Sequence, residues 1–171
     1  MTGSTATLIA AVIAAVSSFA GLFARRASEL RKAHRETLEP HVQDLAEGIH
    51  QAVATSTIIV MTNSEEGREN WRARGADAKE KLKDLRVQLR YSLWGLDEAL
   101  KDLSQVPDWV EHAWDYPDYR EEIIERGDKL GDALDHSIRK CYRKGRTPSW
   151  FERARVEYRR WRLRSYYESY K

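Results

Sequence analysis

The chain opens with a long uncharged stretch and continues with apolar residues at helical spacing. Residues 5–24 carry no charged side chain. Further along, apolar positions recur every three or four residues over about 40–61, 68–104, 119–143 and 149–167. No stretch alternates with the period of two that strands need. The pattern predicts an all-α protein, with one N-terminal transmembrane helix followed by a cytoplasmic helical bundle of about four to five helices.

Breaks between the predicted helices fall at Pro40, which marks a kink or a new start, at the loops 62–67 and 115–118, and at the residues before Ser149. Ser149 and Glu152 stand at the spacing of a capping box, which predicts the start of the last helix. The apolar faces predict a core that contains Val42, Leu45, Ile49, Val53, either Ile59 or Val60, Leu82, Leu85, Leu89, Leu93, Leu96, Leu100, Leu103, Ile123, Leu130, Leu134, Ile138 and Cys141.

The uncharged stretch 5–24 has the length of a membrane span. At 1.5 Å per residue it covers about 30 Å, the thickness of a bilayer's hydrocarbon core. Arg25 and Arg26 follow it, whereas a signal peptide carries its positive charge in front. Because basic residues stay in the cytoplasm, we expect a protein of the cell (inner) membrane with its N-terminus outside and the bulk of the chain in the cytoplasm. The alternative is a buried core helix.

Small residues form a seam along one face of this stretch. Ala11, Ala14, Ser18 and Gly21 are spaced three or four residues apart, so they share one face of a helix. Helices associate in lipid through such faces because small side chains let the backbones approach closely. We therefore predict a contact between spans at these four residues, and a homo-oligomer.

Charge divides the chain unevenly. Residues 1–137 carry 17 basic and 24 acidic side chains, whereas residues 138–171 carry 12 basic and 3 acidic ones. We expect a transmembrane anchor at 1–26, a cytoplasmic bundle at 27–148 and a basic, aromatic C-terminal helix at 149–171. Only one cysteine, Cys141, is present, which excludes an internal disulfide framework.

The last helix interleaves aromatic residues with arginine. Three interpretations of its stripe of Phe151, Ala154, Tyr158 and Trp161 stand open: it closes the bundle, it lies on anionic membrane lipids, or it binds nucleic acid. Binding to lipid is favoured over binding to nucleic acid, because a domain anchored in the membrane lies next to the anionic cytoplasmic leaflet. The residues predicted to contact the anionic partner are Arg153, Arg155, Arg159, Arg160, Trp161, Arg162 and Arg164.

Residues 97–135 are the most acidic part of the chain, with 13 acidic and 4 basic side chains. A solvated face is the first interpretation. The alternative is a docking surface, either for a soluble partner protein or for the basic tail of a neighbouring copy.

No pattern predicts a catalytic, metal or cofactor site. Phosphate loops, dinucleotide fingerprints and nucleophile elbows are absent, and the pair Glu47–His50 lacks the further ligands of a di-iron bundle. Arg35 precedes His41 by six residues, which is similar to the Arg–His spacing of the HEPN helical ribonucleases. This resemblance covers seven residues.

The sequence thus predicts a non-enzymatic, self-associating, single-span membrane protein, either a bacterial pore-forming or membrane-perturbing effector or an anchored scaffold. The alternative is a membrane-tethered nucleic-acid-binding protein, with an HEPN-like ribonuclease as its enzymatic form. A third hypothesis is an adaptor that holds a soluble partner through the acidic face.

Overall fold

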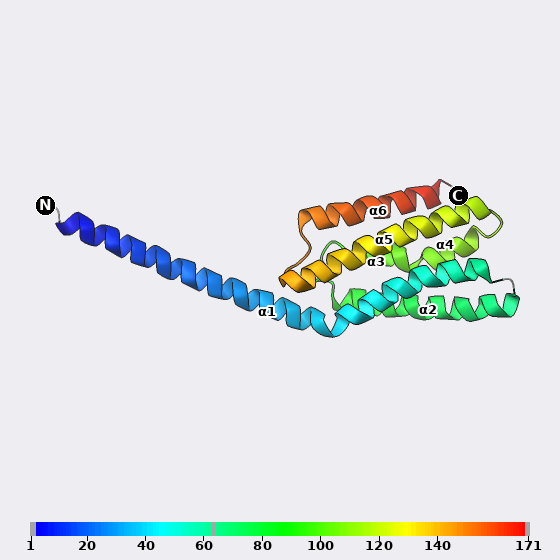
Figure 1. Cartoon of the computed structure of the whole chain (residues 1–171), viewed down its shortest axis with the longest axis horizontal. Coiled ribbons are helices and arrows are strands. Elements are labelled where there is room, and N and C mark those ends of the chain that lie inside the picture. Colours follow the sequence, from blue (N-terminus) through cyan, green and yellow to red (C-terminus); the bar gives the residue numbers. More distant parts are fainter. Residues whose placement is uncertain (1–2, 63, 170–171) are drawn as a thin grey trace.

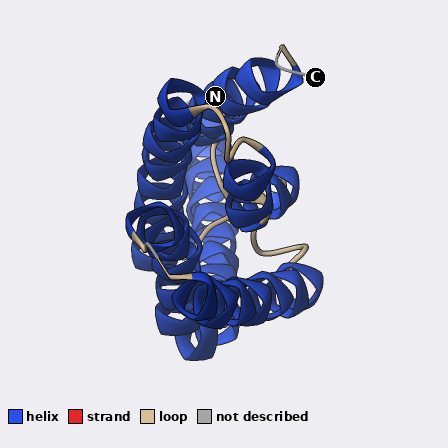
Figure 2. Ribbon diagram, turned by 90° about the vertical axis from the view of Figure 1, so that its right-hand side faces the viewer, coloured by secondary structure: helices blue, strands red, loops and turns tan. Residues whose placement is uncertain are grey.

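The computed structural model of the chain describes residues 3–62 and 64–169, and the side chains from residue 16 onward. These residues form six helices and no strand, as Figures 1 and 2 show. The predicted all-α helical bundle is confirmed. The helices are α1 (Gly3–Met61), α2 (Glu65–Gln88), α3 (Asp97–Ser104), α4 (Val106–His112), α5 (Pro117–Lys144) and α6 (Trp150–Glu168).

Helix α1 has two parts with different surroundings. Its N-terminal part projects from the molecule as an arm, and its C-terminal part lies inside the bundle (Figure 1). Residues 16–33 are exposed throughout, and Leu38 is the first fully buried side chain. The helix stays continuous through Pro40 but bends where it enters the bundle. Proline explains the bend, because it cannot donate the backbone hydrogen bond and its ring pushes against the preceding turn.

The predicted membrane span is not supported by the fold. No helix in the described part of the chain holds a segment long and apolar enough to cross a membrane. Residues 5–15 of the predicted span (5–24) lie outside the residues whose side chains are described.

The bundle is built around the second half of α1. Helices α2 and α5 both pack against it, and α6 packs on α5 at the edge of the bundle (Figure 1). The predicted core is confirmed: its leucines, isoleucines and Cys141 are at most 6% exposed, while Val42 and Val53 pack against it half-buried. Together these side chains bury one continuous apolar core, which is the main force that holds a helical bundle together.

The predicted helix over 68–104 is wrong in one respect, because the structure divides it. Helix α2 ends at Gln88, a series of turns follows, and α3 begins at Asp97. Gly95 sits in these turns at a φ of +82°, where a side chain would be strained. Its position is also crowded, since a Cβ atom there would lie 2.5 Å from Cδ of Arg153. The buried leucines continue through the turns.

Helix α6 packs with a face that the sequence did not single out. Val156, Leu163 and Tyr167 are buried against the bundle, and the Tyr167 ring stacks on Trp109 with centroids 4.5 Å apart. The stripe of Phe151, Ala154, Tyr158 and Trp161 is exposed. The interpretation that this stripe closes the bundle is therefore wrong.

Candidate functional site

Helix α5 ends against the arm of α1, and backbone contacts hold the two together. Gly145 closes α5 in the left-handed conformation, with a φ of +59°. A Cβ atom at this glycine would lie 2.4 Å from the carbonyl oxygen of Arg31, so only glycine fits. Arg35 Nη2 donates a hydrogen bond of 2.6 Å to the carbonyl oxygen of Arg143 in the last turn of α5. The base of the arm is thereby fixed to the bundle.

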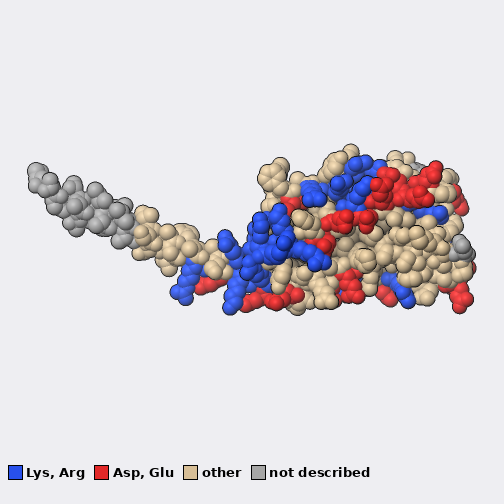
Figure 3. Space-filling model, viewed as in Figure 1, with Lys and Arg blue, Asp and Glu red and all other residues tan. Residues whose placement is uncertain are grey.

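This junction gathers a strong positive charge, which we call the basic collar: residues 25–36 of α1 and 143–146 at the end of α5. The two segments hold eight basic and two acidic side chains, a net charge of +6. Figure 3 shows this basic surface between the arm and the body of the bundle. Two exposed pairs, Arg25–Glu29 and Lys32–Glu36, neutralise part of it. Among the described residues, Arg26, Arg31, Arg143 and Lys144 have no ion-pair partner.

Residues 16–24, whose side chains are described just before the collar, are all exposed and are apolar or small. The large ones are 62–71% exposed, and they are Val16, Phe19, Leu22 and Phe23. Water-soluble proteins rarely leave such a contiguous apolar surface uncovered. Exposed apolar surface of this kind is typical of a contact site for lipid or protein.

The predicted seam lies on this arm. Ala11 and Ala14 fall outside the residues whose side chains are described. Ser18 and Gly21 are exposed, and a Cβ atom at Gly21 would meet nothing within 4 Å. Space for a close helix neighbour therefore exists at Gly21.

The outer face of α6 is a second exposed aromatic surface. Trp150 and Phe151 meet edge to face with ring centroids 4.8 Å apart, and they are 66% and 77% exposed. Both lie at the start of α6, and this end of the helix points toward the arm (Figure 1). Tyr158 and Trp161 continue the exposed surface along the helix, at 53% and 61% exposure.

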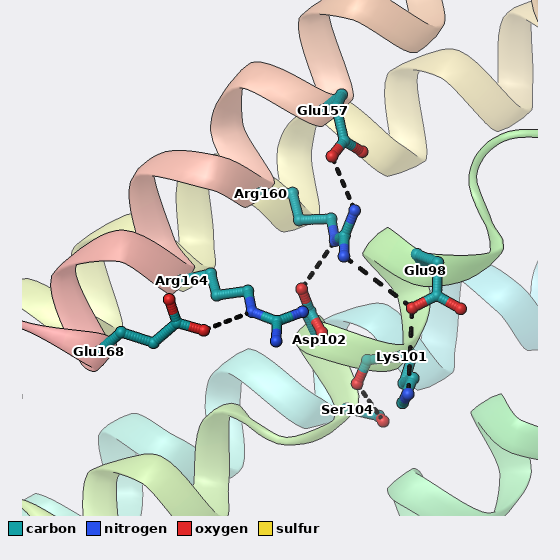
Figure 4. A network of polar contacts seen from close by, with 8 residues as sticks. All are labelled: Glu98, Lys101, Asp102, Ser104, Glu157, Arg160, Arg164 and Glu168. Carbon is teal, nitrogen blue, oxygen red and sulfur yellow. Dashed lines mark hydrogen bonds and ion pairs between the residues drawn. The ribbon is translucent and has the colours of Figure 1, made fainter. Parts of the chain in front are cut away.

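Three of the predicted arginines are held by neighbouring side chains. Arg160 reaches α3, where its Nε donates to Oδ2 of Asp102 at 2.7 Å, and its other nitrogens approach Glu98 and Glu157 (Figure 4). Arg164 pairs with Glu168 on the same helix. Arg153 lies over the Trp94 ring, 4.3 Å from its centroid. The Arg160 contact ties α6 to α3, and all three guanidinium groups already have a partner within the chain.

Three other predicted arginines have guanidinium groups that form no hydrogen bond or ion pair within the described residues. They are Arg155, Arg159 and Arg162, and their spacing of four and three residues puts them on one side of α6. Arg155 is exposed, and Arg159 and Arg162 are half-buried beside Lys129 of α5. We call them the basic row.

Glu152 anchors the start of α6. Its side chain is 5% exposed and accepts hydrogen bonds from Arg146 and from the backbone N–H of Ser149, while Lys140 pairs with it at 3.0 Å. The Ser149 hydroxyl caps the helix in return, so the predicted capping box is confirmed. The hydrogen bonds from Arg146 hold the pKa of the Glu152 carboxyl well below its usual range.

The acidic part of the chain presents a row of its own on α5. Asp128, Asp132 and Asp135 are spaced four and three residues apart and border a shallow cavity of about 250 Å³ between α5 and α1. Asp135 pairs with Arg139 of the same helix. Asp128 and Asp132 are exposed and have no ion-pair partner in the described part of the chain. We call these three residues the acidic row.

The side chains that could take part in catalysis or metal binding form no site within the described residues. Arg35 is held by the α5 carbonyl, and His41, one and a half turns further along α1, is half-buried. No group of three metal-binding side chains occurs among the described residues. Burial raises the pKa of the Cys141 thiol to about 11, which disfavours the reactive thiolate.

Sequence reasoning identified the arginines of α6 but missed the basic collar. The collar exists because α5 ends against the arm, and no local pattern in either segment reveals that contact. Comparison with known proteins adds no family: no protein-family model, curated protein or solved structure matches the chain.

Proposed function

We propose that this chain is a non-enzymatic, self-associating membrane protein that is anchored by its N-terminal arm and carries its bundle on the cytoplasmic side. The observation that carries the proposal is the order of surfaces along α1. An exposed apolar arm leads directly into the basic collar, and this is the order that a span and its cytoplasmic flank require.

The arrangement of the collar supports this orientation. Arg31 and Lys32 lie on the arm itself, and Arg143 and Lys144 are brought beside them by the end of α5. Each basic residue near an anionic leaflet contributes about 1 kcal/mol to binding. Trp150 and Phe151, at the end of α6 that points toward the arm, suit the headgroup zone, where aromatic rings with polar neighbours prefer to lie.

Compartment reporters fused to either end of the full chain test the proposal. A cytoplasmic C-terminus, an external N-terminus and retention in the membrane fraction after a salt wash are expected. Changing Arg25, Arg26, Arg31 and Lys32 to Gln should weaken the orientation, because charges within about 15–20 residues of a span set topology. As a matched control, changing Arg74, Lys83, Arg86 and Arg90 to Gln should leave it unchanged. Intact protein in the soluble fraction would contradict the proposal.

Self-association of the anchored chain is compatible with two alternative functions. The protein is either a pore-forming or membrane-perturbing effector or an anchored scaffold. The count of copies in detergent separates them. A closed assembly of many copies, with leakage of a dye from proteoliposomes, supports the pore. A small oligomer without leakage supports the scaffold.

A second candidate is nucleic-acid binding, because unpaired Arg155 and Arg159 stand beside exposed Tyr158. Arginine on phosphates and aromatic rings on bases are the usual contacts with single strands. The test is RNA binding by the full chain in detergent, which should weaken steeply with salt. The ribonuclease form receives no separate support, since Arg35 is engaged with α5.

A further inference from the structure

We infer that the acidic row of α5 and the basic row of α6 are the two halves of a self-complementary interface, and that the partner they fit is a second copy of this chain. The inference deepens the proposed self-association and rests on it. It adds a contact between the bundles to the seam predicted on the arm, and it assigns residues to the docking of a neighbour's basic tail that the acidic stretch 97–135 left as an alternative.

The two rows match in spacing and in charge. Both have steps of four and three residues, at 128, 132 and 135 on α5 and at 155, 159 and 162 on α6. Like charges four residues apart on one helix repel each other and destabilise it. Asp128–Asp132 and Arg155–Arg159 are such pairs, and neither finds a counter-ion within the described chain. A partner of the opposite charge removes both costs.

The rows also lie at the same level of the bundle, on the two sides of α5: the acidic row borders the cavity between α5 and α1, and the basic row borders a recess between α5 and α6. Lys129, which follows Asp128, lines this recess together with Arg159 and Arg162, and Glu122 and Arg126 of α5 complete it. Figure 3 shows basic atoms over α6 and acidic atoms beneath them on the same side of the molecule. A twofold axis parallel to the long axis of the bundle therefore sets each acidic row against the basic row of the other copy.

This symmetry agrees with a common anchor. Rotation about an axis along the bundle leaves both arms pointing in the same direction, as two chains in one membrane require. The contact is polar, and each exposed ion pair contributes only weakly. It is strengthened when both copies are held in one membrane or one detergent micelle, because this raises their effective concentration. The same two copies then contact each other twice, at the seam on the arm within the membrane and at the rows on the bundle outside it.

The test exchanges the charges of the rows in the full chain in detergent and measures the mass of the protein–detergent complex. Asp128→Lys with Asp132→Lys sets basic rows against basic rows, and Arg155→Glu with Arg159→Glu sets acidic rows against acidic rows. Each variant alone should raise the dissociation constant of the dimer at least about tenfold. The chain with all four substitutions should regain the wild-type dimer, and so should a mixture of the two double variants.

A matched control is Asp77→Lys with Asp84→Lys on α2, which makes the same charge change away from the rows and should leave the dimer intact. Circular dichroism of each variant verifies that the helices have formed. If the fourfold variant regains the dimer, the interface is supported. If the rows instead contact lipid or RNA, the fourfold variant should not recover, because its basic row has been lost. An unchanged mass in both double variants overturns the inference.

A cross-link test separates this inference from the proposed function. Chains with Asp132→Cys are mixed with chains carrying Arg159→Cys, and a short thiol cross-linker should join them into dimers. Absence of the cross-link in a protein that still dimerises in the membrane overturns the bundle interface but leaves the anchored, self-associating protein standing. A chain that never reaches the membrane overturns the proposed function, whatever the rows do.

Discussion

Arg160 of α6 reaches across to Asp102 of α3, and its Nε lies 2.7 Å from Oδ2 of a carboxylate that is only 4% exposed. The two residues are 58 positions apart in the sequence. Glu98 and Glu157 surround the same guanidinium (Figure 4). The pair is therefore a buried polar clasp that ties the last helix to the middle of the chain.

We predict that Arg160→Met destabilises the protein by about 3 kcal/mol, because it leaves the Asp102 charge buried without its partner. The measurement is the free energy of unfolding from denaturant titration. Lys83→Met on α2 is the control. Its partner Glu80 is exposed, so a loss of about 0.5 kcal/mol or less is expected. Equal losses in the two variants would contradict the clasp.

A second prediction concerns pH and the start of α6. The pKa of Glu152 is lowered by its hydrogen bonds from Arg146, so the folded state favours the carboxylate. This stabilisation is fully present above the ordinary pKa of glutamate, about 4.3, and is lost as the pH falls toward the lowered value. Glu152→Gln should therefore be clearly less stable than wild type at neutral pH.

The difference between the two proteins should shrink as the pH falls below about 4, and unfolding titrations at pH 7 and pH 3 measure it. Glu66→Gln, an exposed glutamate on α2, serves as the control and should show little difference at either pH. A constant difference between wild type and Glu152→Gln at both values would show that the carboxylate contributes no pH-dependent stability.

Gly95 provides a third prediction. Its positive φ strains any residue with a Cβ atom, and the Arg153 side chain would have to move aside, so Gly95→Ala should cost about 1–2 kcal/mol. Thermal unfolding followed by circular dichroism measures the loss. Gly21→Ala on the exposed arm is the comparison, and the bundle transition should not move. A bundle unaffected by Gly95→Ala would mean that the turn between α2 and α3 adjusts freely.

The same turn shows where sequence reasoning succeeds and where it stops. Leu82, Leu89, Leu93 and Leu100 keep a helical spacing throughout, so their burial could be predicted from the sequence. The chain nevertheless leaves the α-helix between Leu89 and Leu100. The apolar pattern does not reveal this, because consecutive turns also bury every third or fourth residue. Only Gly95 marks the break, and a single glycine inside a helical pattern is a weak signal.

Helix α6 presents the opposite difficulty, because two of its faces have apolar residues at helical spacing. One holds Phe151, Tyr158 and Trp161, and the other holds Val156 and Leu163. The packing partner decides which face is buried. The second face fits against the bundle because Arg160 and Glu152 at its margins meet Asp102 and Arg146 there. Asp102 lies on α3 and Arg146 in the loop before α6, so the sequence of α6 alone could not identify them.

The last prediction returns to the arm. Ala14→Leu with Gly21→Leu should hold neighbouring spans apart, because only small side chains allow close backbone approach. The same change adds apolar surface, so insertion into the membrane should improve. Val12→Leu, on another face of the arm, is the control. The readout is oligomer mass in detergent, compared with membrane retention of the same variant. If the oligomer persists in the seam variant but is lost when the charges of the α5 and α6 rows are reversed, the bundle holds the copies together and the arm only anchors them.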